Sequence, residues 1–362
     1  MEQKRRIALV LGGGGMKGFA HIGVLRALEE AGVQPTLYAG TSIGALLSAA
    51  YVGGMTIDEM ERRALSLRKR DLFRINHVGM LLERMRSPSI YLEEPLRALC
   101  TNAIPGGTFE DLPVPLLVNT VDVERGTQVV WGLPGLRDVR IDDAVYASCA
   151  LPGFFPPGRV DGRLCIDGGT IDNMPVAIAA QDADAVIAVD VGSSDLSHNT
   201  EASSQGFAAT YMRAATVMMH ALQLSPLREW MRPPMFLIRP RLGHVGWLSF
   251  SHTSEVIAEG YRAARDALIQ LPECLAASSG VFPRAAYRLE VDRNLCTGCG
   301  LCAAIAPDTM AMDSTNKAYP LSQIVNWCSA DGDFVRHCPT EAISASRLTQ
   351  TAEQPVPQKE VA

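Results

Sequence analysis

The chain of 362 residues is long enough for one large core and a smaller module, and its 47% hydrophobic and 20% charged residues exclude global disorder. Its net charge of −6 lacks the basic excess that nucleic-acid-binding proteins usually carry. No apolar run approaches the roughly 20 residues of a membrane span, and the run after Arg6 is too short for the core of a signal peptide. We therefore expect a cytoplasmic protein, while a peripheral contact with the inner face of the membrane stays open.

The first predicted element is a strand at residues 7–11, a continuous apolar run that ends at four successive glycines. A run of this kind, bounded by glycine, suits a central strand buried on both faces. Residues 19–31 follow with the apolar spacing of a helix. The loop amides and the N-terminus of this helix together form a potential anion site.

Three functional interpretations compete for the glycine loop, besides a plain turn without a ligand. Its glycines match the spacing of a dinucleotide fingerprint, yet the next strand does not end in the acidic residue that would hold a ribose. A P-loop requires a lysine followed by serine or threonine, whereas Lys17 is followed by Gly18. The third interpretation is an oxyanion hole made by the backbone N–H groups of Gly13, Gly14 and Gly15. Only this interpretation uses the serine that follows.

Ser42 lies at the centre of a Gly-Thr-Ser-Ile-Gly sequence, which fits the G-x-S-x-G turn that holds a nucleophilic serine between a strand and a helix. Gly40 and Gly44 are expected where the sharp turn leaves no room for a Cβ atom. The flanking residues agree, because residues 35–39 read as a short strand and residues 45–50 as a helix.

Residues 56–100 look helical and contain a basic run that includes Arg68, Lys69 and Arg70. Such a run is most often a solvated helix face, although it would also suit anionic lipid headgroups. The further predicted strands are residues 116–121, 128–131, 185–190 and 235–238, and the further predicted helices are residues 142–150, 173–180, 206–224 and 254–271, with a polar loop at residues 193–204.

Asp167 is followed by Gly168 and Gly169 at the end of a short apolar strand. An aspartate in such a bend can point its carboxylate into a cleft. The alternative is an ordinary turn aspartate, because Asp-Gly is a common turn pair.

Four motifs in order resemble those of the bacterial patatin-like phospholipases over residues 5–272: Gly-Gly-Gly-Met-Lys-Gly at 13–18, Gly-Thr-Ser-Ile-Gly at 40–44, Ser-Cys-Ala-Leu-Pro-Gly-Phe-Phe-Pro at 148–156, and Asp-Gly-Gly at 167–169 with Asn-Met-Pro at 173–175. The resemblance implies a three-layer α/β/α fold and a Ser–Asp dyad without histidine. It makes Ser42 the nucleophile, Asp167 the general base and residues 13–15 the oxyanion amides, with Lys17 at the basic position of the family. Gly169 stands where many members have alanine.

The implied chemistry is transfer of an acyl group from an ester to water through an acyl-enzyme. A carboxylate is a weaker base than imidazole, so the dyad must be close and partly desolvated. The rival is a Ser–Asp–His hydrolase that uses Asp167 or Asp190 with His244 or His252, an order that such enzymes permit.

A Cys-x2-Cys-x2-Cys sequence and a distant Cys-Pro lie near the C-terminus, with the spacing that holds iron–sulfur clusters. The local fourth position is Ala306 rather than cysteine, which argues for a single [4Fe–4S] cluster. Residues 287–347 resemble the small bacterial monocluster ferredoxins, an α+β fold. Zinc is the alternative metal. The expected ligands are Cys296, Cys299, Cys302 and Cys338, while Cys328 and the scattered Cys100, Cys149, Cys165 and Cys274 are expected to be free thiols.

We therefore expect an acyl hydrolase domain at residues 1–272, a linker at 273–286, a 4Fe–4S ferredoxin-like domain at 287–347 and a disordered tail at 348–362. The predicted function is lipid ester hydrolysis of the phospholipase A or lysophospholipase type, which the cluster gates or couples to redox state. The alternative is an electron-transfer or redox-sensing protein with a regulated or vestigial hydrolase domain. The expected partners are a lipid or acyl ester, with a membrane surface and a redox partner left open, and no nucleic acid.

Overall fold

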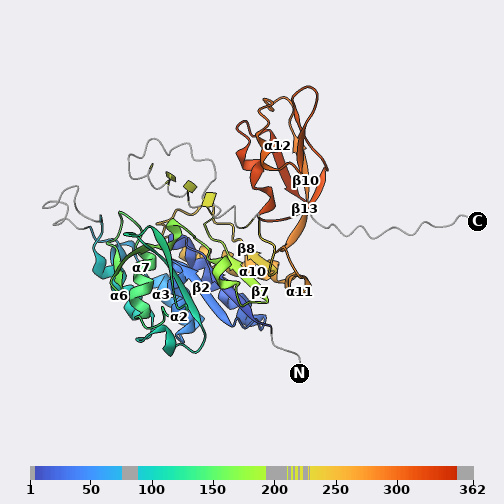
Figure 1. Cartoon of the computed structure of the whole chain (residues 1–362). Coiled ribbons are helices and arrows are strands. Elements are labelled where there is room, and N and C mark those ends of the chain that lie inside the picture. Colours follow the sequence, from blue (N-terminus) through green and yellow to red (C-terminus); the bar gives the residue numbers. More distant parts are fainter. Residues whose placement is uncertain are drawn as a thin grey trace, which may run out of the picture. The chain divides into compact units, whose positions relative to one another are not determined.

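The computed structural model describes residues 5–75, 89–192, 210, 213–214, 217–218, 221–222, 227 and 229–348. The chain divides into two compact units, Met1–Pro283 and Arg284–Ala362, and each is described by itself (Figure 1). The predicted loop at 193–204, most of the predicted helix at 206–224 and the tail beyond residue 348 lie outside the described residues.

The N-terminal unit is built on a nine-stranded mixed sheet whose central strands are parallel (Figure 1). Its order is β5-β6-β3-β2-β1-β7-β8-β9, and β4 also pairs with β3, along residues 118–122. The strands are β1 (Ile7–Leu11), β2 (Leu37–Thr41), β3 (Leu116–Asp122), β4 (Thr127–Trp131), β5 (Gly158–Val160), β6 (Arg163–Asp167), β7 (Ala185–Val189), β8 (Met235–Ile238) and β9 (Val281–Phe282).

The apolar runs explain this order. All five residues of β7 and four of the five residues of β1 are buried, as a parallel strand covered on both faces requires. The strands β4, β5 and β6 join the other edge as antiparallel neighbours. The predicted α/β class is confirmed.

Helices cover the sheet. α1 packs along α10 and α3, while α2 contacts β2, β3 and α7. The expected helical stretch at 56–100 is divided into α3, α4 and α6, because the backbone is extended at Leu67 and Leu92, and residues 76–88 lie outside the described part. The helices are α1 (Ala20–Glu30), α2 (Ile43–Val52), α3 (Ile57–Ser66), α4 (Lys69–Leu72), α6 (Glu93–Ala103), α7 (Ile141–Cys149), α8 (Val176–Ala179), α10 (Thr253–Leu268) and α11 (Leu271–Ala276).

The C-terminal unit has its own core, which includes Leu289, Met310 and Phe334. Its three-stranded antiparallel sheet has the order β13-β10-β14, beside the hairpin β11–β12. The elements are β10 (Arg284–Val291), α12 (Leu301–Ile305), β11 (Met310–Met312), β12 (Ala318–Pro320), β13 (Ile324–Cys328), the 3-10 segment η7 (Asp331–His337) and β14 (Ile343–Arg347).

The segment 273–286 differs from the predicted linker. It contains the end of α11, and β9, whose Val281 and Phe282 pair with β8 in the large sheet. Only residues 277–280 connect these two elements, because the apolar pair Val281–Phe282 is buried at the sheet edge. The boundary between the two units along the chain therefore falls after Pro283.

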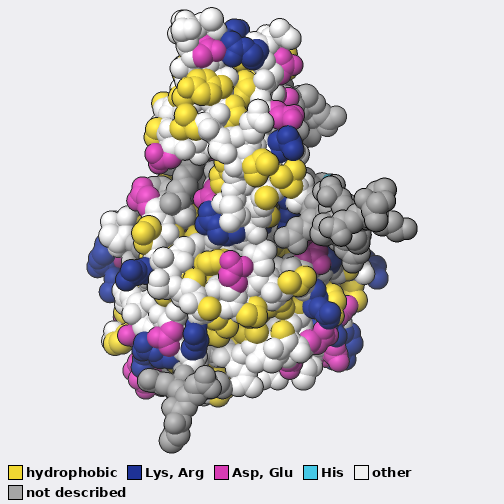
Figure 2. Space-filling model, turned by 90° about the vertical axis from the view of Figure 1, so that its right-hand side faces the viewer, with side chains coloured by type: hydrophobic (Ala, Val, Ile, Leu, Met, Phe, Trp, Pro, Cys, Tyr) yellow, Lys and Arg dark blue, Asp and Glu magenta, His cyan; other side chains and the backbone are white. Residues whose placement is uncertain are grey.

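Acidic and basic side chains are interspersed on the face drawn in Figure 2, with no single basic field. Among the described residues, no helix has the length and apolar character needed to cross a bilayer.

Candidate active site and cluster cavity

Ser42 is the single residue between the end of β2 and the start of α2, and its backbone has φ 55° and ψ −127°. This left-handed conformation is strained for serine and exposes the side chain at the end of the strand. The neighbouring glycines are required by contact: a Cβ on Gly40 would lie 2.5 Å from the carbonyl carbon of Gly44, and one on Gly44 would lie 2.0 Å from the carbonyl oxygen of Leu11. The predicted strand–turn–helix is present.

The structure brings Asp167 to Ser42. β2 and β6 both pair with β3 and meet end to end along one side of it, since Thr41 is paired with Asn119 and Thr120 is paired with Asp167, while β4 pairs along the other side. The Ser42 hydroxyl donates a hydrogen bond to the Asp167 carboxylate, and the N–H of Gly169 donates to Oδ1 of the same group at 2.8 Å. Burial raises the pKa of Asp167 to about 6, although both hydrogen bonds oppose the shift. A base with this pKa is largely ionised at neutral pH and still accepts a proton readily.

The glycine loop differs from the prediction at one of its three amides. The N–H of Gly13 donates to the carbonyl of Asn173 at 3.3 Å. Within the described part of the chain, the amides of Gly14 and Gly15 have no recorded acceptor, and Gly15 lines the same pocket as Ser42. The expected set of three amides is therefore reduced to two.

Buried polar groups hold this loop in place. The side-chain amide of Asn173 donates to the carbonyl of Gly13 at 3.0 Å, and Nε2 of His21 lies 2.8 Å from the carbonyl of Gly12. Burial lowers the pKa of His21 to about 4, so the ring is neutral and Nε2 carries the donated proton.

Lys17 is 1% exposed, and burial lowers its pKa to about 8. Gly18 packs so closely on Ile43 that a Cβ would lie 2.1 Å from that side chain.

An apolar pocket opens beside the dyad, with about 640 Å³ of empty space including its mouth. Phe154 and Phe155 line it, as do Trp247 and Leu248. The structure therefore places both aromatic segments in the pocket wall. The remaining lining residues are Gly15, Met16, Ile43, Leu46, Leu72, Phe73, Leu96, Leu99, Cys149 and Leu151, with Ser42 and Asp167.

The histidine triad finds no support in the geometry. His244 is exposed and bonded to Glu255 at 2.7 Å, while Nδ1 of His252 is within 2.8 Å of Ser249 Oγ. Asp190 is buried against Arg239, with Oδ2 and Nε 2.9 Å apart. These groups are therefore engaged elsewhere, and the histidines do not line the pocket of Ser42.

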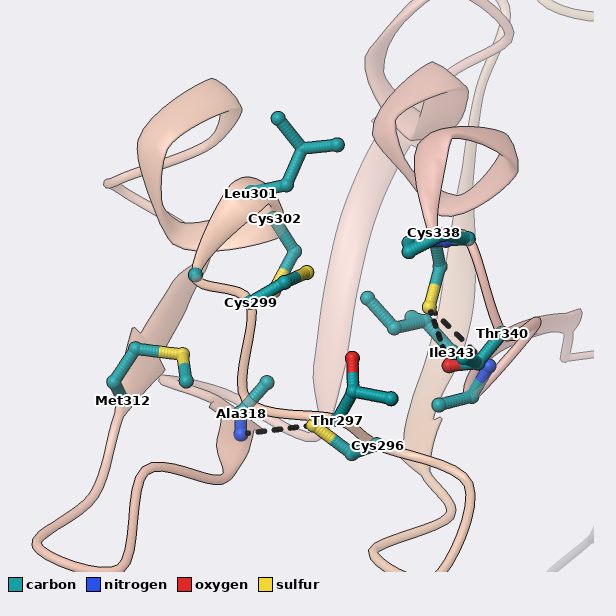
Figure 3. A pocket seen from close by; sticks show the side chains of 13 residues that line it. Cys296, Thr297, Cys299, Leu301, Cys302, Met312, Ala318, Cys338, Thr340 and Ile343 are labelled. Atoms are coloured by element: carbon teal, nitrogen blue, oxygen red, sulfur yellow. Dashed lines mark hydrogen bonds between the residues drawn. The ribbon is translucent and has the colours of Figure 1, made fainter.

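The four predicted cluster ligands line one cavity in the C-terminal unit, with about 320 Å³ of empty space including its opening to solvent. Figure 3 shows Cys299 and Cys302 on one side of this space and Cys338 on the other, with Cys296 beside Ala318. Backbone N–H groups donate to two of the sulfurs, from Ala342 to Cys338 at 3.3 Å and from Ala318 to Cys296 at 3.5 Å. Such hydrogen bonds stabilise thiolate ligands of iron–sulfur clusters.

The donor set fits a cluster better than a single ion. Across the described residues, no three His, Cys, Asp or Glu side chains are arranged to hold one metal ion, as zinc would require. The cysteines instead surround a space. Cys328 does not line this cavity; it is buried at the end of β13, and burial raises its pKa to about 11. This agrees with its expected role as a free thiol.

Comparison with known protein families gives two matches: residues 9–180 match the model of patatin-like phospholipase, and residues 289–345 match that of a 4Fe-4S single cluster domain. The chain carries a patatin-like phospholipase domain. The matched residues contain Ser42, Asp167 and the glycine loop, and the second match contains all four cysteines of the cavity.

Relatives of the patatin-like domain include an uncharacterized NTE family protein of Mycobacterium tuberculosis, 36% identical over 191 residues that span 52% of this chain and 50% of the relative. Patatin-like phospholipase domain-containing protein 6 of Homo sapiens is 37% identical over 201 residues, which cover 52% of this chain and 14% of that protein. Lysophospholipase NTE1 of Phaeosphaeria nodorum is 30% identical over 319 residues, 80% of this chain and 20% of that protein. The chain thus spans half, or less, of the length of these relatives.

Among solved structures, VipD from Legionella pneumophila is similar with a TM-score of 0.39 and 16% identity, over 76% of this chain and 67% of that chain. The type III effector protein ExoU is similar with a TM-score of 0.35 and 16% identity, over 75% of this chain and 54% of that chain.

Sequence reasoning missed three residues next to the dyad of the patatin-like domain. Cys149 was expected to be an ordinary buried thiol, yet it lines the pocket and contacts the Ser42 hydroxyl and the Cys100 thiol. Asn119 and Ser148 are completely buried and hydrogen-bonded to the turns that carry the dyad. Ser148 and Cys149 belong to the Ser-Cys-Ala-Leu-Pro motif, which was the available signal, whereas Asn119 had none beyond being a polar residue in an apolar strand.

Proposed function

We propose that this protein is a serine acyl hydrolase that cleaves lipid carboxylic esters with a Ser42–Asp167 dyad. The observation that carries the proposal is the hydrogen bond from the Ser42 hydroxyl to a buried carboxylate at the wall of an apolar pocket. The patatin-like phospholipase match over residues 9–180 supports it.

In the proposed reaction Asp167 accepts the Ser42 proton as the serine oxygen attacks the ester carbonyl. The amides of Gly14 and Gly15 donate to the oxyanion that forms, and Gly13 supports the loop through its bonds with Asn173. The ester bond then breaks, and the leaving alcohol takes the proton from Asp167. Asp167 next activates a water molecule that hydrolyses the acyl-enzyme and returns the proton to Ser42.

The remaining glycines and Lys17 have supporting roles in the proposal. Gly40 and Gly44 permit the turn at Ser42, and Gly18 permits close packing of the loop on α2. Gly168 and Gly169 form the turn after Asp167, where the Gly169 amide holds the carboxylate. Lys17 adds a buried amine to the loop.

The pocket favours a long acyl chain as the bound part of the substrate. Apart from Ser42 and Asp167, its lining side chains are apolar or weakly polar. Transfer of an alkyl chain from water into such a pocket is favourable, whereas burial of a polar group without a partner is costly. A charged headgroup finds no partner inside the pocket and is expected to remain at its mouth. We therefore propose a phospholipase A or lysophospholipase type of activity, in line with the lysophospholipase named among the relatives.

The test compares the full-length protein with Ser42→Ala and Asp167→Asn on short p-nitrophenyl esters and on lysophospholipid. Hydrolysis by the parent protein and its loss in both variants are expected, with unchanged thermal unfolding of Ser42→Ala as the check on folding. Full activity in either variant would exclude the dyad.

We also propose that the C-terminal unit holds one [4Fe–4S] cluster on Cys296, Cys299, Cys302 and Cys338, since these four thiols line a single cavity. Such a cluster supplies one-electron redox chemistry when bound. We propose that its redox state gates the hydrolase. The corresponding domains are Met1–Pro283 and Arg284 onward, close to the predicted 1–272 and 287–347.

Electron transfer or redox sensing for a partner is the second candidate function, and the same cavity favours it. Iron and acid-labile sulfide are measured on anaerobically purified protein, and hydrolysis is compared for reduced, oxidised and cluster-free samples. A rate that changes with cluster state supports gating. Equal rates, with the cluster present and reducible, support the second candidate.

A peripheral membrane contact and a cytoplasmic location remain part of the proposal. Arg68, Lys69 and Arg70 are exposed on or beside the short helix α4, next to Leu72 and Phe73 of the pocket lining. Basic residues at this position suit anionic headgroups. Co-sedimentation with phosphatidylglycerol vesicles, and its loss at high salt or on reversal of these charges, tests the contact.

A further inference from the structure

We propose that Asn119 and Ser148 form a clamp that positions the nucleophile and the base of the dyad relative to each other. The inference rests on the proposed function and assigns a role to Asn119, which lies outside the four motifs, and to Ser148, whose motif was given no role in the dyad. Both are positioning residues, because they act through Ser42 and Asp167.

Asn119 lies on β3, which pairs with both strands that carry the dyad, β2 and β6. Its side-chain amide donates to the carbonyl of Asp172 at 2.6 Å and lies 3.3 Å from the carbonyl of Gly168, the residue after Asp167. The same nitrogen lies 3.3 Å from the hydroxyl of Thr41, the residue before Ser42. One buried amide therefore contacts both turns.

Ser148 connects the backbone of Asn119 to the nucleophile. Its hydroxyl donates to the carbonyl of Asn119 at 2.7 Å and accepts the backbone N–H of Ser42 at 2.9 Å. The amide of a residue with φ 55° at a strand–helix turn has no regular backbone partner, so Ser148 supplies the missing acceptor. This bond therefore helps to hold the strained turn in place.

Burial makes the clamp stiff. Asn119 and Ser148 are both 0% exposed, and the carbonyl oxygen of the Asn119 side chain accepts from Gln128 at 2.9 Å, so the orientation of the amide is fixed by its own partner. A buried donor without an acceptor is costly, which penalises any displacement of the two turns. Gly168 shows how closely the parts fit, since a Cβ there would lie 2.4 Å from the carbonyl oxygen of Asn119.

The clamp acts on chemistry rather than on substrate binding. Neither residue lines the acyl pocket, so its loss leaves the contacts with an acyl chain in place. A shift of the Asp167 turn lengthens the Ser42–Asp167 hydrogen bond and admits water to the carboxylate. The rate of acylation then falls, and the acid limb of the pH–rate profile moves to lower pH because the carboxylate is less desolvated.

The experiment uses full-length Asn119→Ala, the isosteric Asn119→Asp and Ser148→Ala, with Thr120→Val as the matched control. Thr120 is a completely buried neighbour on the same strand, but its hydroxyl bonds to Val129 and Trp131 on the other face. Steady-state hydrolysis of a soluble ester across pH, labelling of Ser42 by a fluorophosphonate and thermal unfolding are measured for each.

We expect kcat to fall by about tenfold to a hundredfold in the clamp variants with KM within about twofold, because small displacements of catalytic groups have effects of this size. Labelling of Ser42 slows in parallel, and the acid limb shifts to lower pH in Asn119→Ala. The fall in kcat is expected to be at least as large in Asn119→Asp as in Asn119→Ala. The aspartate places a carboxyl oxygen, in place of the N–H donors, against the oxygen atoms of Thr41, Gly168 and Asp172. Thr120→Val is expected to keep the parental kcat and pH profile, even if it lowers the unfolding temperature as much as the clamp variants do.

Clamp variants whose kcat, labelling rate and acid limb match those of Thr120→Val would overturn the inference. If Asn119→Ala does not fold, Ser148→Ala decides through the kcat and labelling comparison. A parent protein without Ser42-dependent hydrolysis would instead contradict the proposed function, so the two failures are distinguishable.

Discussion

The hydroxyl of Ser42 donates a hydrogen bond to the carboxylate of Asp167, and β3, which pairs with both of their strands, supplies the asparagine whose side chain contacts both turns. The relative position of Ser42 and Asp167 therefore depends on the single position of Asn119 in the sheet. Burial is the main cause of the raised pKa of Asp167, so the same packing that brings the groups together also sets the strength of the base.

Hydrolysis is expected to depend on the ionisation of Asp167. The base must be deprotonated to accept the Ser42 proton, and burial raises its pKa to about 6. The rate with a soluble ester should therefore rise with pH through about 6 and level off above it. A profile of kcat/KM against pH measures this limb, and a limb near the ordinary carboxyl value of about 4 would contradict a desolvated base.

Asp167→Asn is expected to stabilise the protein at neutral pH. Burial raises the pKa in the folded state from 3.8 to about 6, so the folded chain holds this proton more tightly than the unfolded chain. The contribution of this group to the free energy of unfolding falls as pH rises through that window and is most unfavourable above it. The gain at pH 7.5 is on the order of 2–3 kcal/mol and vanishes near pH 3.5, as each pKa unit corresponds to about 1.4 kcal/mol.

Denaturant unfolding at the two pH values measures this difference. Asp184→Asn is the comparison, because its partner Arg6 helps to hold the pKa of that exposed carboxyl below the ordinary value and the sign is reversed. Equal stability of Asp167→Asn and the parent at both pH values would argue against the buried carboxylate.

Leu99→Trp is expected to shorten the preferred acyl chain. Leu99 lines the apolar pocket, and a larger side chain there removes space that a long chain would fill. The ratio of kcat/KM for decanoyl over butanoyl p-nitrophenyl ester should fall about tenfold or more, since each methylene excluded from an apolar site is worth about 0.8 kcal/mol. Leu65→Trp serves as the control, because Leu65 is 50% exposed on α3. An unchanged ratio in Leu99→Trp would place the acyl chain elsewhere.

Gly44→Ala is expected to abolish activity by distorting the turn. Its Cβ would lie 2.0 Å from a backbone oxygen of β1, which no side-chain movement can relieve. We expect a loss of stability of about 3 kcal/mol or more together with the loss of Ser42 labelling. Gly106→Ala, where no atom lies within 4 Å of the added Cβ, should behave as the parent. Labelling by fluorophosphonate and thermal unfolding report both effects.

Cys338→Ser is expected to lose the cluster, although Cys338 is far from the other three ligands in sequence. It lines the same cavity as Cys296, Cys299 and Cys302, so its removal leaves three thiols. Iron and sulfide per chain should fall from about four of each to well below one. Cys328→Ser should keep the parental content, since Cys328 lies outside the cavity. Loss of iron in Cys328→Ser alone would require a different ligand set.

Much of this protein is readable from local sequence. The strand at residues 7–11, the Gly-x-Ser-x-Gly turn and the triple cysteine motif follow from apolar runs, from the steric demands of glycine and from ligand spacing, all of which act within about ten residues of chain. The strand at residues 235–238 was predicted with its observed bounds for the same reason.

The tertiary structure decided what depends on distant residues. The pairing of Thr41 with Asn119, and of Thr120 with Asp167, brings the nucleophile, the base and the Asn119 part of the clamp together from three strands. The amide of Gly13 finds its acceptor on Asn173, and the short strand at Val281 joins the sheet because β8 offers it an edge. Hydrogen bonding and desolvation between elements carry no local pattern, so the sequence named the reacting groups and the fold set their geometry and their pKa values.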